Sequence, residues 1–209
     1  MGKGILLVGF DFTRAHEDEF HDWYDLEHIP ERERVPGFGD CTRWISVENP
    51  KVAIASYELD SLSVLETPAY RAIGGDNLSV WSKRMIGICE RLLRFEGEKF
   101  GAGAAEAPRG AGGLLVNAMN VAPEHEAEFN EWYDSEHIPA LSAVPGALAA
   151  RRFRSRSSPR YLAIYHLQSP EVAASAAWQT AANTPWTERI RHHFRDRLRI
   201  LCHAYRRSG

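Results

Sequence analysis

The pattern Trp-Tyr-Asp-x-Glu-His-Ile-Pro occurs twice in this chain, from Trp23 to Pro30 and again from Trp132 to Pro139. The two copies are 109 residues apart in a chain of 209 residues. The tripeptide Val-Pro-Gly follows both copies at the same spacing. Because similarity at a fixed period is typical of repeated structural units, we predict a tandem duplication in which each half builds the same fold.

The segment between the two halves differs from both in composition. Residues 97–113 are rich in Gly and Ala and contain few large apolar side chains. Such composition is typical of a flexible linker. We therefore expect a first repeat over residues 1–98, a linker over residues 99–111 and a second repeat over residues 112–209.

Both halves predict the same order of elements. Each begins with a short apolar run, followed by an amphipathic helix that carries the repeated pattern, two strands, a second helical region and a final strand. The expected segments in the first half are 4–10, 14–31, 38–47, 52–59, 61–88 and 89–96, and in the second half 113–121, 123–141, 147–154, 160–167, 169–195 and 198–205.

The order β-α-β-β-α-β is that of the ferredoxin-like split βαβ unit. Its sheet carries helices on one face only, so the other face needs a cover. A second copy of the same sheet is the simplest cover. We therefore expect an α+β fold with two ferredoxin-like repeats in one chain, whose sheets pack face to face as an intramolecular α+β barrel.

Composition excludes several classes of function. The net charge is −3 and the pI is near 6.3, whereas nucleic-acid-binding domains are usually basic, with a pI above about 9. No apolar stretch approaches the roughly 20 residues that span a membrane. Three widely spaced cysteines give neither a disulfide framework nor a zinc pattern. We expect a cytoplasmic protein that binds neither nucleic acid, nor membrane, nor a metal ion.

The repeated helix places a carboxylate among aromatic side chains. At about 100° per residue, Glu27 falls in the middle of a stripe with Phe20, Trp23 and Tyr24, whereas His28 falls on its rim. Burial raises the pKa of a carboxyl group, as a general acid or base requires. Glu27 and its counterpart Glu136 are therefore candidate catalytic residues. The alternative is that an arginine pairs with each and fixes the helix.

The histidines of the pattern also allow two interpretations. His28 and His137 could transfer protons, and Asp25 and Asp134, which lie three residues earlier, could orient their rings. They could equally well stabilise a helix C-terminus, where an imidazolium can bond to the free carbonyl groups and interacts favourably with the helix dipole.

Aromatic and basic residues near the pattern are candidates for ligand contacts. Spacing alone favours a core position for Trp23 and Tyr24, and for the matching Trp132 and Tyr133. The following strand carries an arginine next to an aromatic residue in each half, Arg43 and Arg152. Each arginine could bind an anionic ligand, or pair with the glutamate of its own half, which is the interpretation that we favour.

Taken together, these residues resemble a known family. The pattern Glu-x-Glu-Phe-x-x-Trp-Tyr-Asp-x-Glu-His-Ile-Pro, with the following Val-Pro-Gly and Arg-aromatic pair, is similar to the EthD-like branch of the dimeric α+β barrel superfamily, at residues 17–44 and 126–153. Most relatives have one unit per chain and dimerise. The resemblance thus implies an internal pseudo-dimer, which a further homodimer could extend.

The superfamily includes cofactor-free monooxygenases, polyketide cyclases, lactone isomerases, dehydratases and haem-binding branches. The resemblance implies a cofactor-independent enzyme that isomerises, cyclises or dehydrates an aromatic, lactone or polyketide-like small molecule. His28 and His137 would transfer the proton, while the tyrosine and glutamate of each pattern would line or orient the site. The alternatives are a non-catalytic ligand-binding or assembly module and, last, a haem protein.

The two halves differ just after the pattern, where the first continues with Glu31-Arg32-Glu33-Arg34 and the second with Ala140-Leu141-Ser142-Ala143. One site could therefore be inactive or bind another ligand.

Overall fold

The computed structural model describes residues 2–207 of the chain. The chain divides into two compact units, Met1–Glu98 and Lys99–Gly209. Within the described residues, no helix is both long enough and apolar enough to cross a membrane.

The first unit contains the helix and strand order that its sequence predicts. Its elements are β1 (Gly4–Asp11), α1 (Glu17–Asp22), the π-helical turn η1 (Trp23–His28), α2 (Ile29–Glu33), β2 (Phe38–Ser46), β3 (Val52–Leu59), the 3₁₀ turn η2 (Leu62–Glu66), α3 (Pro68–Arg71), the 3₁₀ turn η3 (Gly75–Asn77), α4 (Val80–Ile88) and β4 (Glu90–Lys99).

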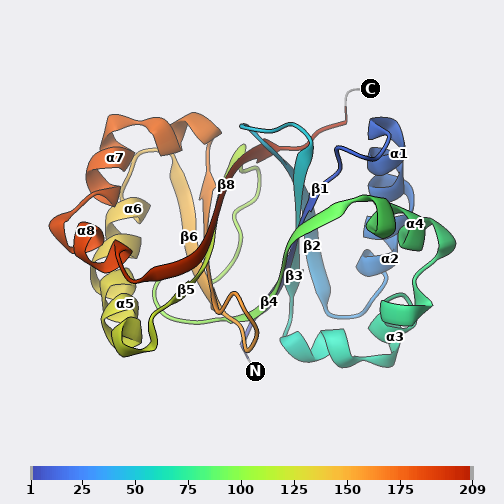
Figure 1. The fold of residues 1–209 in the computed structure, drawn as a ribbon, viewed down its shortest axis with the longest axis horizontal. Coiled ribbons are helices and arrows are strands. Elements are labelled where there is room, and N and C mark those ends of the chain that lie inside the picture. Colours follow the sequence, from blue (N-terminus) through green and yellow to red (C-terminus); the bar gives the residue numbers. More distant parts are fainter. Residues whose placement is uncertain (1, 208–209) are drawn as a thin grey trace. The chain divides into compact units, whose positions relative to one another are not determined.

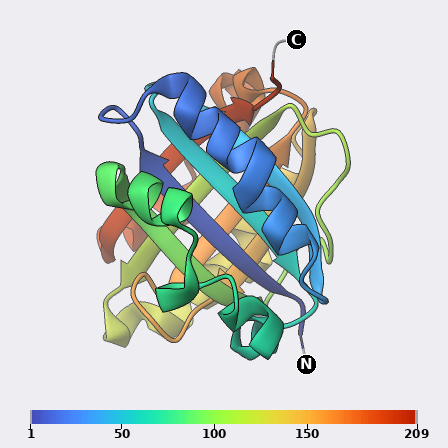
Figure 2. The ribbon, with the colours of Figure 1, turned by 90° about the vertical axis from the view of Figure 1, so that its right-hand side faces the viewer.

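The strands of the first unit form an antiparallel sheet in the order β4-β1-β3-β2. The central strand β1 is buried along nearly its whole length, which explains its continuous run of apolar residues. The helices of this unit lie on one side of its sheet (Figure 1). The helix that carries the repeated pattern crosses the strands (Figure 2).

The second unit has the same element order. It consists of β5 (Gly113–Val121), the 3₁₀ turn η4 (Pro123–His125), α5 (Glu126–Trp132), the π-helical turn η5 (Tyr133–His137), α6 (Ile138–Ser142), β6 (Ala147–Arg154), β7 (Tyr161–Leu167), the 3₁₀ turn η6 (Pro170–Ala174), α7 (Ala176–Ala182), α8 (Pro185–Arg191) and β8 (Phe194–Ala204).

Its strands are also antiparallel, in the order β8-β5-β7-β6. The helices α5 to α8 lie on one side of this sheet (Figure 1). The core between sheet and helices is largely aromatic, and includes Phe129, Trp132, Tyr133, Tyr165 and Trp178. The aromatic stripe predicted from the repeated helix is therefore a packed core face in this unit.

The predicted helix of each half is continuous, but it contains a π-helical turn in the middle. In the first unit this turn covers Trp23–His28, and in the second Tyr133–His137. A π-turn accommodates an extra residue, so later side chains are rotated back by about one position. His28 is therefore buried, while Glu27 is only partly buried. The prediction from a uniform 100° per residue, which placed Glu27 centrally and His28 on the rim, is wrong for this reason.

Helix boundaries depart from the predictions in two further places. The first helix begins at Glu17 rather than at Arg14. The residues before it form a turn, in which the backbone N–H of Thr13 donates to the Asp11 carboxylate. The second helical region of each half is a series of short helices and 3₁₀ turns. Proline and glycine residues that interrupt these regions explain the short lengths.

The glycine of each Val-Pro-Gly turn allows the chain to pass from helix to strand. Gly37 has φ +94° and Gly146 has φ +87°, values that L-residues with a side chain rarely adopt. A Cβ atom on either glycine would lie 2.6 Å from a methyl carbon of Val64 or Val172. Both the backbone conformation and the close approach therefore require glycine.

Part of the Gly/Ala-rich segment after β4 is held by backbone hydrogen bonds within the second unit. The backbone N–H groups of Phe100 and Ala104 donate to the carbonyl oxygens of Arg152 and Ala150 on β6. The N–H of Ala102 donates to Asp134 at 2.9 Å. Residues 100–104 thus follow the edge of β6, an arrangement that composition alone did not predict.

Candidate functional site

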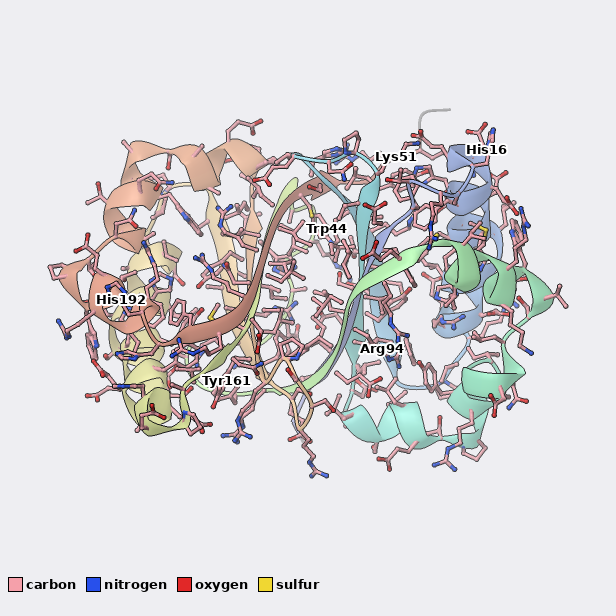
Figure 3. All side chains as sticks on the ribbon, in the orientation of Figure 1. His16, Trp44, Lys51, Arg94, Tyr161 and His192 are labelled. Atoms are coloured by element: carbon pink, nitrogen blue, oxygen red, sulfur yellow. The ribbon has the colours of Figure 1, made fainter. Side chains whose placement is uncertain are left out.

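A cavity of about 340 Å³ lies between the sheet and the helices of the first unit. His28 lines it from the end of the π-turn, Arg32 from α2, and Tyr57 from β3. β4 contributes Arg91 and Arg94, the second of which is marked in Figure 3. The rest of the wall is mostly apolar: Leu6, Val8, Phe10, Leu78 and Ile86, with Tyr70 and two glycines.

The second unit has a cavity in the equivalent place, of about 220 Å³. His137 and Tyr133 line it from the repeated helix, and Tyr165 from β7. Its remaining wall comes from β5, the following helices and β8, namely Leu115, Asn117, Met119, Trp132, Leu141, Trp178, Gln179, Ala182, Asn183, Thr187, Arg191, Phe194, Arg197 and Arg199. Neither cavity wall contains a carboxylate side chain.

Each repeated histidine is held as a neutral imidazole. Desolvation by burial, together with Arg32, Arg94 and Arg43, holds the pKa of His28 well below its usual range. Burial, with nearby arginines, lowers the pKa of His137 to about 3. Each ring packs against the tryptophan of its own pattern, with ring centroids 4.3 Å apart for Trp23 and 4.2 Å for Trp132. A neutral, immobilised imidazole can accept a proton from a ligand in the cavity.

A pair of buried tyrosines lies next to each histidine. In the first unit, burial raises the pKa of Tyr24 and of Tyr57, and each phenol also acts on the other. Tyr133 and Tyr165 form the matching pair, again with raised pKa values caused mainly by burial. All four phenols are therefore protonated at neutral pH and can donate hydrogen bonds.

Several buried polar atoms in the cavity walls have no hydrogen-bond partner within residues 2–207. They are His28 Nδ1 and Tyr57 Oη in the first cavity, and His137 Nδ1, Tyr165 Oη and Asn117 Oδ1 in the second. Buried polar groups are normally paired, so each exception calls for an explanation. The residues that carry these atoms contribute to the walls of the two cavities.

The repeated glutamates occupy a different environment from the one predicted. Glu27 accepts hydrogen bonds from the hydroxyls of Ser79, at 2.5 Å, and Ser82, at 3.1 Å. Glu136 accepts one from Thr184, at 2.5 Å. Ser79 and Thr184 are the N-cap residues of α4 and α8. Neither glutamate lines a cavity or pairs with Arg43 or Arg152. Glu27 instead joins the repeated helix to the start of α4, and Glu136 joins it to the start of α8.

The strand arginines pair with the aspartates of the pattern. Arg43 donates to Asp25 at 2.6 Å, and Arg152 donates to Asp134 at 2.8 Å. The Arg152 guanidinium lies 4.2 Å from the Tyr133 ring centroid, in a cation–π arrangement. Both arginines are buried behind the tyrosines and outside the cavity linings.

The predicted ligand-contacting aromatics are divided between the two units. Trp132 and Tyr133 line the second cavity, whereas Trp23 and Tyr24 do not line the first. The indole of Trp23 donates to Ser82 and that of Trp132 to Thr187. Both tryptophans are fully buried, which agrees with the core position that spacing alone favours.

The cavity arginines were missed by the sequence prediction. Arg197 and Arg199 alternate along β8, a pattern that places both on one face of a strand, and this signal could have identified them. Asn117 lies directly opposite Arg199 in the β5–β8 pairing, which no sequence signal indicated. Among residues 2–207, no group of three or more His, Cys, Asp or Glu side chains could hold a metal ion.

The chain has a mixed α+β fold that is similar to solved ferredoxin-fold proteins. An anthrone oxidase-like protein has 12% sequence identity and a TM-score of 0.66, with 99% of this chain and 92% of that chain covered. A mutant chlorite dismutase from Candidatus Nitrospira defluvii has 11% identity and a TM-score of 0.59, with 98% and 92% covered.

A ferredoxin fold protein from Listeria monocytogenes, described as related to antibiotic biosynthesis monooxygenases, has 10% identity and a TM-score of 0.56, with 99% and 96% covered. No family model and no curated protein matches the chain. At these identities the likeness establishes the fold alone.

Proposed function

We propose that this protein is a tandem-duplicated, EthD-like enzyme that acts without a cofactor on small carbonyl compounds of the aromatic, lactone or polyketide-like type. The observation that carries the proposal is a buried, neutral histidine that ends a π-helical turn and lines a cavity in each unit. The shared pattern and the same element order in both units support the duplication. The protein would then be the single-chain counterpart of a dimeric α+β barrel.

The cavity walls suit proton abstraction next to a carbonyl group. His28 or His137 would accept the proton, which leaves an enolate or phenolate in the cavity. Arginine side chains and phenol O–H groups in the same wall would stabilise the negative charge as it develops. The arginines lower the basicity of the imidazole, but they also lower the pKa of the substrate C–H, and an anion between them would raise the histidine pKa again.

Glu27 and Glu136 take a positioning role in this proposal. Each carboxylate already accepts hydrogen bonds from hydroxyl groups at the N-terminus of α4 or α8. They therefore hold the π-turn, and with it the histidine, against the helix that closes the cavity. Arg43 and Arg152 likewise support the tyrosine and aspartate of each pattern rather than contact the ligand.

Deuterium exchange tests the proposed reaction. The purified protein would be incubated in D₂O with a panel of aryl ketones, lactones and 1,3-dicarbonyl compounds, and the loss of the signal of the C–H next to the carbonyl followed by proton NMR. We expect exchange above the buffer rate for at least one class. His28→Gln with His137→Gln should lower the rate by roughly 10²-fold or more, the usual contribution of a general base.

The single variants would show which unit is active. His203 is exposed and outside both cavity linings, so His203→Gln is the matched control and should keep the wild-type rate. Wild-type exchange in the folded double histidine variant would contradict the proposal.

A second candidate is cofactor-free oxygenation. It is favoured by the fold similarity to an anthrone oxidase-like protein and to a relative of antibiotic biosynthesis monooxygenases. The first step would be the same proton abstraction, after which the carbanion would react with O₂. An oxygen electrode separates the two candidates, because isomerisation, cyclisation and dehydration consume no O₂.

A further inference from the structure

The two cavities differ in how their positive charge is compensated. In the first cavity, Arg32 is paired with Glu31 at 2.8 Å, and Arg94 is paired with Glu96. Arg32 also donates to the His28 carbonyl oxygen at 3.2 Å. Two of its three arginines are therefore already neutralised by carboxylates of the same unit.

The arginines of the second cavity have no such carboxylate. Arg191 donates to the neutral amide oxygen of Asn183 at 3.0 Å. The side chains of Arg197 and Arg199 make no hydrogen bond or ion pair with any other described side chain. Partial burial is the main reason why the pKa of Arg197 is lowered, and the charges of Arg191 and Arg199 lower it further. The three positive charges therefore act on one another. Three exposed arginines without a carboxylate partner among the described residues therefore contribute to the wall of one small cavity.

Strand pairing directs two of these arginines to the same wall as a buried amide. Arg197 and Arg199 are two positions apart on β8 and share a face, and Arg199 lies opposite Asn117 on β5. Asn117 is 8% exposed, and its Oδ1 atom has no hydrogen-bond partner within residues 2–207. In the first unit the equivalent pair is Arg94 opposite Val8, so the polar side chain is specific to the second unit.

The wall of the same cavity carries further hydrogen-bonding groups. The His137 Nδ1 atom is buried and has no hydrogen-bond partner among the described residues, and the buried Tyr165 hydroxyl belongs to the same wall. Trp132, Trp178 and Phe194 supply flat apolar surfaces beside them. A ligand that satisfies this wall needs a negatively charged group near β8 and an aromatic or other planar body near the helices.

We propose that the cavity of the second unit binds an organic anion, an aromatic or other planar carboxylate, with Arg197 and Arg199 binding the carboxylate and Asn117 and His137 completing the polar contacts. This rests on the proposed function, for which it names the substrate class of one site. The first cavity, with a larger volume, a more apolar wall and paired arginines, takes a neutral or less charged ligand.

Binding of benzoate, compared with its neutral analogue benzamide, tests this inference independently of any reaction. Isothermal titration calorimetry on the whole chain should show one benzoate site, with benzamide at least about tenfold weaker, because charge-assisted hydrogen bonds are the strong ones. Arg197→Gln and Arg199→Gln should each weaken benzoate binding roughly tenfold. Arg197→Lys should retain part of the affinity, because it keeps the charge.

A matched control comes from the helix next to the cavity. Arg189 on α8 is exposed and lies outside the cavity lining, so Arg189→Gln should leave the benzoate affinity unchanged. Circular dichroism would verify that each variant is folded. Increasing the NaCl concentration should weaken benzoate more than benzamide, since salt screens the charge.

Three outcomes would overturn the inference: equal affinity for benzoate and benzamide, two equivalent benzoate sites per chain, or equal competition by inorganic sulfate. Deuterium exchange separates this inference from the proposed function. If benzoate binds as expected but no carbonyl compound exchanges its proton, the anion site stands and the enzymatic proposal fails. If exchange occurs but benzoate does not bind, the enzymatic proposal stands and the anion site fails.

Discussion

The Trp23 indole N–H donates to the Ser82 hydroxyl at 2.9 Å, and both side chains are fully buried. Ser82 in turn donates to Glu27 at 3.1 Å. In the second unit, Trp132 donates to Thr187 at 3.1 Å, and the Thr184 hydroxyl beside it bonds to Glu136. The tryptophan and glutamate of each pattern are thus joined to the same helix N-terminus, which explains why both recur at a fixed spacing.

Thr187→Val tests this connection, because it removes the hydroxyl at nearly constant shape. It leaves the Trp132 N–H buried without a partner, so we expect the free energy of unfolding to fall by about 1–3 kcal/mol. Urea denaturation followed by tryptophan fluorescence measures it. Thr67→Val, at a partly buried N-cap of α3, is a comparison variant that should cost only about 1 kcal/mol. An unchanged midpoint for Thr187→Val would show that the bond contributes nothing.

Arg152 and Asp134 should respond unequally to mutation. The Arg152 side chain is 1% exposed, whereas that of Asp134 is 40% exposed. Arg152→Ala removes packing on Tyr133 and leaves Asn130 Oδ1 unpaired, so we expect a loss of about 3 kcal/mol. Asp134→Asn keeps a hydrogen-bond acceptor near solvent and should cost about 1 kcal/mol. Equal losses in chemical denaturation would contradict this account.

Acidic pH should destabilise the fold through the buried histidines. The pKa of His137 is about 3 when folded, below the usual 6.5, so between these values the unfolded state binds one more proton than the folded state. The free energy of unfolding therefore falls as the pH drops below about 6.5, with a limiting slope near 1.4 kcal/mol per pH unit for each such histidine. His28 adds to the effect in the same direction.

Denaturation between pH 5 and 7 gives this slope, and His137→Gln should lower it by about one proton. His203→Gln serves as the control, because His203 is exposed. If the unfolding free energy of His137→Gln had the same pH dependence as that of the wild type, the His137 imidazole would not have a lowered pKa in the folded state.

Two glycine substitutions should have opposite effects. Gly37→Ala places a methyl group 2.6 Å from Val64 Cγ2, on a residue with φ +94°, so we expect a loss of about 1–3 kcal/mol. Gly87 lies within α4 with open space around its missing side chain, so Gly87→Ala should stabilise by up to about 1 kcal/mol. Differential scanning calorimetry would show the two melting temperatures moving in opposite directions, and a tolerated Gly37→Ala would disprove the turn argument.

Much of the fold could be predicted from the sequence. The strand at Val52–Leu59 is found as expected, because its run of buried residues is a local signal. The element order follows from such runs and from the proline and glycine positions between them. The segment around Phe100 was expected to be flexible, because composition does not report the backbone bonds that it makes to β6.

The candidate site could be predicted only in part. His28 and His137 were identified by their repetition, and both line cavities. Glu27 was placed centrally because a uniform helix was assumed, and the π-turn moved it aside. The arginines of β8 gave no repeated signal, because the two units carry their cavity arginines at largely different positions.

The sequence by itself determined the repeated pattern, the strands and helices of each unit, and the pair of histidines that recur in both. These are properties of local periodicity and of residues that can be compared within the chain. Only the tertiary structure decided which side chains face a cavity and which are held by partners. That decision depends on strand pairing and on the rotation added by a π-turn, which bring residues about 80 positions apart, such as Asn117 and Arg199, to one wall.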